Sequence, residues 1–194
     1  MATEIGVLGL QGAVREHLSS LARLGVEARA VKRVEELEGL SGLILPGGES
    51  TAISLIAGEG FLARLRDLAD AGFPFFGTCA GMILLAREIE GQTESYIRAI
   101  DITVARNASG RQVHSFETTL AVDGIGDDIP AVFIRAPYIT RMGPGVQALA
   151  RYDGAVVMAR EGNVLVTSFH PELTDDLRIH RYFTEMVENY EREV

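Results

Sequence analysis

The sequence of 194 residues contains a single cysteine, Cys79, and this scarcity excludes two kinds of structure. One thiol cannot form an internal disulfide bond, and it cannot build a cysteine-rich zinc site. We therefore expect no metal, and a chain without disulfides suits the reducing cytoplasm. The lone cysteine is then either an inert buried side chain or a nucleophile.

Basic residues are also scarce: 18 lysines and arginines stand against 27 aspartates and glutamates, a formal net charge of -9. Such a surface repels phosphate backbones and anionic lipids, so we expect neither nucleic acid nor a membrane as a partner. No apolar run approaches the roughly 18 residues of a membrane span, and the first residues lack the basic stretch of a secretory signal. Linkers and repeats are missing too, which predicts a single domain over residues 1–194.

The first half of the chain alternates between short apolar runs and helix-like segments. The runs have the continuous hydrophobicity of strands buried on both faces of a parallel sheet, and they cover residues 4–10, 26–32, 42–48 and 73–77. Strands that alternate with helices predict right-handed crossovers and an α/β fold with a mostly parallel sheet.

The second half differs, because strand-like runs follow one another after about Gly91 with little room for helices. Short turn signals in ARYDGAVV and REGNVLV predict hairpins. The last segment, residues 179–190, has apolar residues at helical spacing and predicts an amphipathic helix. We therefore expect one α/β domain whose later strands include antiparallel ones.

Cys79 lies at the centre of the pentapeptide GTCAG, between an apolar run and a helix-like run. Glycines two residues to either side permit a tight strand-turn-helix elbow that holds the central side chain exposed. The N-terminus of the following helix favours the thiolate, and the N–H of Ala80 would point at a developing oxyanion. The alternative is an inert cysteine in a glycine-rich turn.

A nucleophilic thiol needs a base, and the segment VTSFHPEL supplies His170 and Glu172 after the last strand-like run. Pro171 favours an extended His170, and residues two apart in an extended chain project to the same side. Glu172 can therefore orient the imidazole. The alternative is a strand-terminal histidine in an ordinary turn. The remaining histidines lie in patterns typical of exposed helix or loop and are weaker candidates: His17, His114 and His180.

The segment LILPGGEST follows the third strand-like run, and its Gly47 and Gly48 can expose consecutive backbone N–H groups to an oxyanion or a carboxylate. The alternative is a turn that Ser50 caps ahead of a helix, and both roles are compatible at a helix N-terminus. The segment is not a P-loop, because the lysine is missing. Three arginines in later loops suit a substrate carboxylate: Arg106, Arg111 and Arg135.

Together and in this order, PGGES, GTCAG and FHPE resemble the class I glutamine amidotransferases, which use a Cys-His-Glu triad. Longer blocks narrow the resemblance to the glutaminase subunits of pyridoxal 5'-phosphate synthase: LGLQGAVREH, LPGGEST, GTCAGMILLA, RNASGRQ, FIRAPYI and TSFHPELTDDLRIHRYF. These blocks extend from Leu8 to Phe183. The resemblance implies a three-layer α/β fold with flanking helices and additional antiparallel strands in the second half.

The resemblance also implies an activity, the hydrolysis of L-glutamine to L-glutamate and ammonia. Cys79 would attack the side-chain amide, and His170 would protonate the departing ammonia and activate water against the glutamyl thioester. Glu172 would orient His170, while the N–H groups of Gly48 and Ala80 would form the oxyanion hole. The glutamine site of the family maps onto Gly47, Gly48, Glu49, Arg106, Ile134 and Arg135.

A partner follows from the same resemblance. Ammonia would pass through a channel to a synthase subunit in a hetero-oligomer, which makes pyridoxal 5'-phosphate from a pentose phosphate and a triose phosphate. The pyridoxal phosphate is a product, so we expect no cofactor in this chain. The LQG segment around Gln11 is expected to respond to docking. Two loop residues depart from the pattern of the family, Ser109 and His114.

Three alternatives remain open at this point. A glutaminase subunit of another synthase would carry the same triad, although the LQG and HPELTDDLRIHRYF blocks argue against it. A cysteine hydrolase of the peptidase-like branch would have its histidine soon after the elbow. A catalytically silent binding module would lack one of Cys79, His170 or Glu172, and all three are present.

Overall fold

The computed structural model describes residues 3–106 and 115–194; Ser109, Arg111 and His114 therefore lie outside the described residues. Within that part of the chain, the main sheet has ten strands. They are β1 (Glu4–Leu8), β2 (Glu27–Val31), β3 (Gly42–Leu45), β4 (Phe75–Thr78), β5 (Ala86–Ile89), β6 (Ile100–Ala105), β9 (Tyr138–Met142), β10 (Gln147–Tyr152), β11 (Ala155–Glu161) and β12 (Val164–Thr167). A separate hairpin pairs β7 (Phe116–Val122) with β8 (Gly126–Phe133).

The strand order of the main sheet is β2-β1-β3-β4-β12-β11-β9-β6-β5, and β10 pairs with β11. The first five strands of this order are parallel. Four of them, β1 to β4, correspond to the predicted apolar runs, whereas the fifth, β12, comes from the second half of the chain. β11 is antiparallel to β12, β10 and β9, and β9 is antiparallel to β6. The α/β fold with a mostly parallel sheet and later antiparallel strands is thus confirmed.

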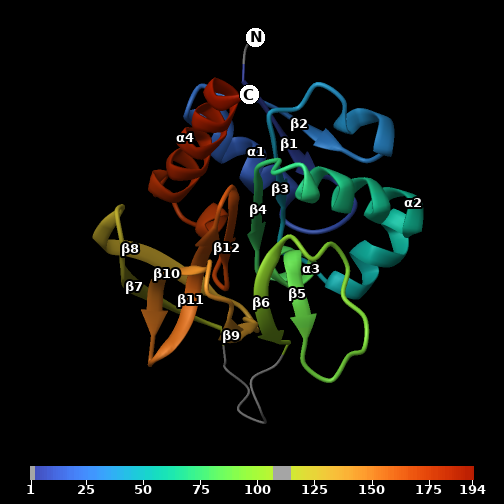
Figure 1. Cartoon of the computed structure of the whole chain (residues 1–194). Helices are drawn as coiled ribbons and strands as arrows, with labels where there is room; N and C mark the ends of the chain where they lie inside the picture. The colour runs from blue at the N-terminus through green and yellow to red at the C-terminus, as the bar shows by residue number, and fades with distance from the viewer. Residues whose placement is uncertain (1–2, 107–114) are drawn as a thin grey trace.

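Helices cover both faces of the sheet (Figure 1). They are α1 (Val14–Arg23), α2 (Ser50–Asp70), α3 (Ala80–Leu85) and α4 (Arg178–Glu193), with short 3-10 turns η1 (Val34–Leu37) and η2 (Pro171–Leu173). Successive strand residues point to opposite faces, so Phe75 of β4 packs with α2 and α3 in one core cluster, while Phe76 packs with α1 and α4 in the other. These two cores produce the three layers.

Glycines mark a break inside helix α2 and the turn of the β10–β11 hairpin. α2 consists of two helical segments that join at Gly58, whose φ of 73° and ψ of 167° are not helical. The tight β10–β11 hairpin turns at Asp153 and Gly154, which both have positive φ, as the hairpin signal predicts.

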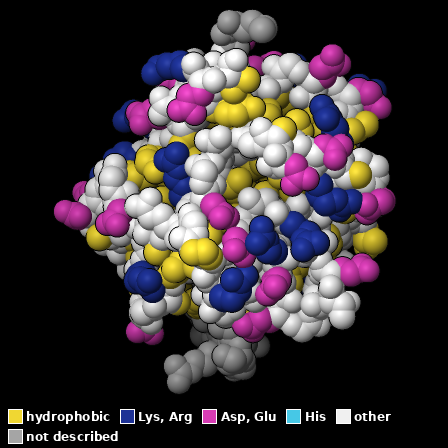
Figure 2. Space-filling view, in the orientation of Figure 1, with side chains coloured by type: hydrophobic (Ala, Val, Ile, Leu, Met, Phe, Trp, Pro, Cys, Tyr) yellow, Lys and Arg dark blue, Asp and Glu magenta, His cyan; other side chains and the backbone are white. Residues whose placement is uncertain are grey.

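The face in Figure 2 carries acidic and basic side chains interspersed with apolar ones. Among the described residues, no helix is long and apolar enough to cross a membrane.

Candidate active site

Cys79 lies at the turn between β4 and α3, and the flanking glycines make that turn possible. Its own backbone has φ 52° and ψ -105°, a left-handed conformation that costs a non-glycine residue on the order of 1–3 kcal/mol. A Cβ on Gly77 would lie 2.5 Å from the carbonyl of Gly81, and one on Gly81 would lie 2.0 Å from the carbonyl oxygen of Leu45. At Gly77 and Gly81, helix α3 and the strands therefore approach each other more closely than a residue with a Cβ would allow.

The sheet topology brings His170 to this elbow. β4 and β12 are parallel neighbours in which Thr78 pairs with Thr167, and the Cys79 N–H donates to the Thr167 carbonyl at 2.8 Å. Their carboxyl ends therefore lie at the same edge of the sheet. The backbone N–H of His170 donates to the Val132 carbonyl of β8 at 2.8 Å, which ties the segment after β12 to the separate hairpin.

Glu172 accepts a hydrogen bond from His170, with 2.6 Å between the Nδ1 and Oε1 atoms. Both side chains are buried, with 7% of His170 and 5% of Glu172 exposed. The backbone conformation that brings these two side chains together differs from the extended one that the sequence predicts. His170 has an intermediate conformation with φ -109° and ψ 87°, and Glu172 lies in the 3-10 turn η2, so an extended chain is not what turns the two side chains together.

The environment of His170 determines its protonation. Burial by itself lowers the pKa of His170, but hydrogen bonds to Cys79 and Glu172 and the charges of both groups outweigh it and raise the pKa to about 10. The ring is therefore held as an imidazolium at neutral pH. An imidazolium beside a thiol stabilises the thiolate and carries a proton for a leaving group.

The loop after β3 lies against the same histidine. A Cβ on Gly47 would lie 2.4 Å from Cε1 of His170, so only glycine leaves room for the ring. The Gly47 carbonyl accepts from the Ala13 N–H at 3.1 Å, and Gln11 Oε1 accepts from the Glu49 N–H at 2.7 Å. The loop after β1 thus holds the glycine loop, residues 47–49, through one backbone hydrogen bond and one hydrogen bond from the backbone to the Gln11 side chain.

Glu49 and Arg106 lie together near the start of α2. Glu49, and not Ser50 as the sequence suggests, caps this helix: its carboxylate accepts from the N–H groups of Thr51 and Ala52 at 3.2 and 2.7 Å. The Arg106 guanidinium is 3.9 Å from this carboxylate and donates to Thr51 Oγ1 at 2.8 Å and to the Tyr96 hydroxyl at 2.7 Å. A fixed cation thus borders the glycine loop.

Ile134 and Arg135 approach from the turn that follows β8. The Ile134 carbonyl is 3.9 Å from Cys79 Sγ, and Arg135 has a positive φ of 45°. Both side chains are exposed. This turn therefore supplies a backbone acceptor beside the thiol.

Sequence reasoning missed two residues of this region. His17 and His180, which it assigns to exposed positions, are both fully buried. His17 lies 3.7 Å from the Glu172 carboxylate and 2.8 Å from His180. The apolar periodicity of α1 and α4 could have revealed them, because each histidine occurs on the same helix face as the core residues Leu21 and Phe183.

The buried histidines predict how stability depends on pH. Burial lowers the pKa of His180 to about 4, and burial with the charges of His180 and His170 lowers that of His17. The unfolded chain takes up protons at these sites near pH 6.5, so the free energy of unfolding should fall as the pH drops from 6.5 towards 4. The raised pKa of His170 acts oppositely: its contribution is complete below about 6.5 and is lost as the pH rises towards 10.

Urea unfolding across this pH range tests that prediction. We expect the greatest stability between the two limbs, with His180→Gln flattening the acid limb because it removes one of the titrating groups. A stability that rises steadily up to pH 9 would contradict the assignment of His170 as a stabilised imidazolium.

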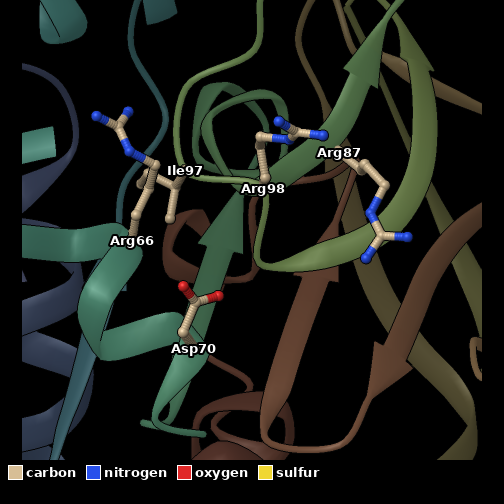
Figure 3. A pocket seen from close by; sticks show the side chains of 5 residues that line it. All are labelled: Arg66, Asp70, Arg87, Ile97 and Arg98. Atoms are coloured by element: carbon tan, nitrogen blue, oxygen red, sulfur yellow. The ribbon is translucent and has the colours of Figure 1, made fainter. Parts of the chain in front are cut away.

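A hollow of about 360 Å³ contains no residue of the triad and is lined by Arg66, Asp70, Arg87, Ile97 and Arg98 (Figure 3). The guanidinium groups of Arg66 and Arg87 point away from one another. Arg66 pairs with Glu59, and Arg87 lies 3.3 Å from Asp101. The guanidinium groups of Arg66 and Arg87 therefore bind acidic partners and do not converge on one point of the hollow.

The fold and the site define a class: α/β proteins in which a cysteine elbow, a histidine and a glutamate meet at the carboxyl edge of a parallel sheet, as in the glutamine amidotransferases. A solved structure described as a glutamine amidotransferase superposes with a TM-score of 0.90 at 50% identity, over 95% of this chain and 98% of its own. The chain belongs to the SNO glutamine amidotransferase family, whose model matches residues 7–189.

Curated relatives agree with this assignment. The pyridoxal 5'-phosphate synthase subunit PdxT of Carboxydothermus hydrogenoformans is 55% identical over 186 residues, 95% of this chain and 97% of the relative. The subunit of the same name from Halalkalibacterium halodurans is 54% identical over 185 residues, 95% of this chain and 94% of the relative. The resemblance inferred from the motifs is thereby confirmed.

Proposed function

We propose that this chain is the glutaminase subunit of a pyridoxal 5'-phosphate synthase, acting as a single domain over residues 1–194 in the cytoplasm. The observation that carries the proposal is the meeting of Cys79, His170 and Glu172, from two distant parts of the chain, at one edge of the sheet. Relatives that carry this subunit name are about 55% identical over 95% of the chain, and this supports the choice of synthase.

The chemistry has two halves. Cys79 Sγ attacks the side-chain carbonyl carbon of glutamine, and the oxyanion accepts hydrogen bonds from the N–H groups of Gly48 and Ala80. His170 gives its proton to the nitrogen, the C–N bond breaks, and ammonia leaves a glutamyl thioester. The neutral His170 then takes a proton from water, which attacks the thioester, and glutamate departs as the thiolate of Cys79 and the imidazolium of His170 re-form. Glu172 holds the ring of His170 throughout.

The substrate is positioned by the groups around the thiol: Gly47, Gly48, Glu49, Arg106, Ile134 and Arg135. We assign the α-carboxylate of glutamine to an arginine, because a guanidinium binds a carboxylate in a bidentate manner. Arg106 suits this role, since its hydrogen bonds to Thr51 and Tyr96 hold it beside the glycine loop. No step of this reaction requires a cofactor.

The partner would be the synthase subunit, which receives the ammonia. Two large apolar side chains of α2, Leu55 and Ile56, are 77% and 57% exposed, close in sequence to the glycine loop. Exposed apolar neighbours of this kind are typical of docking surfaces. The Gln11 side chain, in the exposed loop after β1, accepts a hydrogen bond from the Glu49 N–H. Docking at this end of the molecule would therefore act directly on the position of the glycine loop.

Glutamate formation from glutamine, with and without the purified synthase subunit, tests the proposal. We expect turnover to rise at least about 10-fold with the synthase. Leu55→Asp should remove most of that rise and leave the turnover of the isolated subunit unchanged. Equal turnover with and without the synthase would contradict the coupling, and the lack of glutamate in either case would contradict the glutaminase assignment.

A further inference from the structure

Two buried histidines lie directly behind the proposed triad and have no part in the reaction described above. His17 belongs to α1 and His180 to α4, and no part of either residue is exposed. His17 Nδ1 is 2.8 Å from His180 Nε2, while His17 Nε2 is 3.2 Å from the hydroxyl of Thr78, the residue before Cys79. A polar cluster in the core requires an explanation, because burying such groups is costly unless they are paired.

The cluster faces the carboxylate of Glu172. Its Oε1 accepts from His170, but Oε2 is buried and has no hydrogen-bond partner among the residues that the structure describes. The polar atom that faces this oxygen is His17 Nε2, at 3.7 Å. An anionic oxygen in the core requires a positive dipole or a charge nearby, so the orientation of the His17 ring matters to the triad.

The hydrogen bonds select the tautomers of the pair. If His180 Nε2 donates to His17 Nδ1, the proton of His17 is on Nε2 and points towards Thr78 and Glu172. The unpartnered atom of the cluster, His180 Nδ1, is then a bare lone pair. The opposite arrangement leaves a buried N–H of His180 unpaired and turns a lone pair of His17 towards the carboxylate. The first arrangement is favoured, because unpaired buried N–H groups are rare and like dipoles repel.

We propose that His17 is a positioning residue: its Nε2–H faces the free oxygen of Glu172 and holds the carboxylate with Oε1 towards His170, and His180 fixes the His17 ring. The inference rests on the function proposed above, which supplies the role of Glu172. The pKa of His17 is lowered by burial and by the neighbouring charges of His180 and His170, so the ring remains a neutral donor at physiological pH.

A matched pair of variants separates the two nitrogens of His17. His17→Gln places an amide N–H near the position of Nε2, whereas His17→Asn reaches only the position of Nδ1 and leaves Glu172 without a donor. We expect His17→Gln to retain kcat within about 3-fold and His17→Asn to lose about 10- to 100-fold, with KM within about 2-fold in both. Ser20→Ala, a buried position of the same helix, serves as the control with unchanged kcat.

Alkylation gives a readout that does not depend on glutamine turnover. Because Cys79 is the single cysteine, the rate of its reaction with iodoacetamide reports on this thiol alone. If the carboxylate turns away, His170 becomes a weaker base and the thiolate forms at higher pH. His17→Asn should therefore shift the pH profile of alkylation to higher pH, and His17→Gln should not.

The outcomes are distinct. Wild-type kcat and a wild-type alkylation profile in His17→Asn would overturn the positioning role, and so would equal losses in His17→Asn and His17→Gln. If His17→Asn does not fold, the same comparison can be made with His180→Asn and His180→Gln, because His180 acts on Glu172 through His17. We then expect the larger loss of kcat for asparagine. An inactive wild type with a shifted alkylation profile in His17→Asn would refute the glutaminase assignment while retaining the positioning role.

Discussion

Replacing Cys79 with alanine should abolish glutamine hydrolysis, with a loss in kcat on the order of 10⁴- to 10⁶-fold. Without the thiol there is no thioester, and water would have to attack an unactivated amide directly. The substitution also leaves the buried His170 without the thiol that contributes to its raised pKa, so the ring loses part of its basicity as well. The effect is measured with a coupled assay that detects the release of glutamate in the presence of the synthase subunit.

The fold should withstand this change. Alanine has the same steric restriction at a φ of 52° as cysteine, so the strain at the elbow is unchanged and the melting temperature should remain within a few degrees. Partner binding should also persist, because the Cys79 side chain is buried in the structure, and not exposed as the elbow motif predicts. Glutamate release at a tenth of the wild-type rate or more would eliminate Cys79 as the nucleophile.

The second large effect is expected at Glu172. Glu172→Ala should lower kcat on the order of 10²- to 10⁴-fold and change KM much less, because the carboxylate acts on the orientation and charge of His170 rather than on glutamine. Removing the hydrogen bond and charge of Glu172 should also lower the pKa of His170. Steady-state kinetics and the pH profile of Cys79 alkylation give the two readouts.

Glu172→Gln is the matched control, because it keeps the shape and an acceptor for His170 while it removes the negative charge. We expect its kcat to lie between those of the wild type and Glu172→Ala. A change confined to KM in either variant would show that Glu172 binds substrate and does not orient the histidine.

The sequence predicts the parallel half of the fold well, because buried strands such as β3 and β4 are continuous apolar runs. It does not predict which strands are neighbours. β12 pairs with β4 although about 90 residues separate them along the chain, and no local pattern encodes such a pairing. The adjacency matters most, since it is what places His170 beside Cys79.

Within the site, local signals succeed where the backbone itself requires a residue type. Gly77 and Gly81 are recognisable because the elbow leaves no room for a Cβ. His17 and His180 were misassigned because a histidine in an amphipathic helix resembles a surface residue unless its helix face is assigned. The capping role of Glu49 was also missed, since Ser50 is the more usual cap by residue type.

The most direct test of the account is to trap the nucleophile with a glutamine analogue that carries a diazoketone in place of the amide. The complex with the synthase subunit is incubated with this analogue, and the peptides are analysed by mass spectrometry. We predict one covalent adduct, on Cys79, that forms more slowly in His170→Ala and that excess glutamine prevents. An unmodified Cys79, or an adduct that glutamine does not suppress, would contradict the central claim.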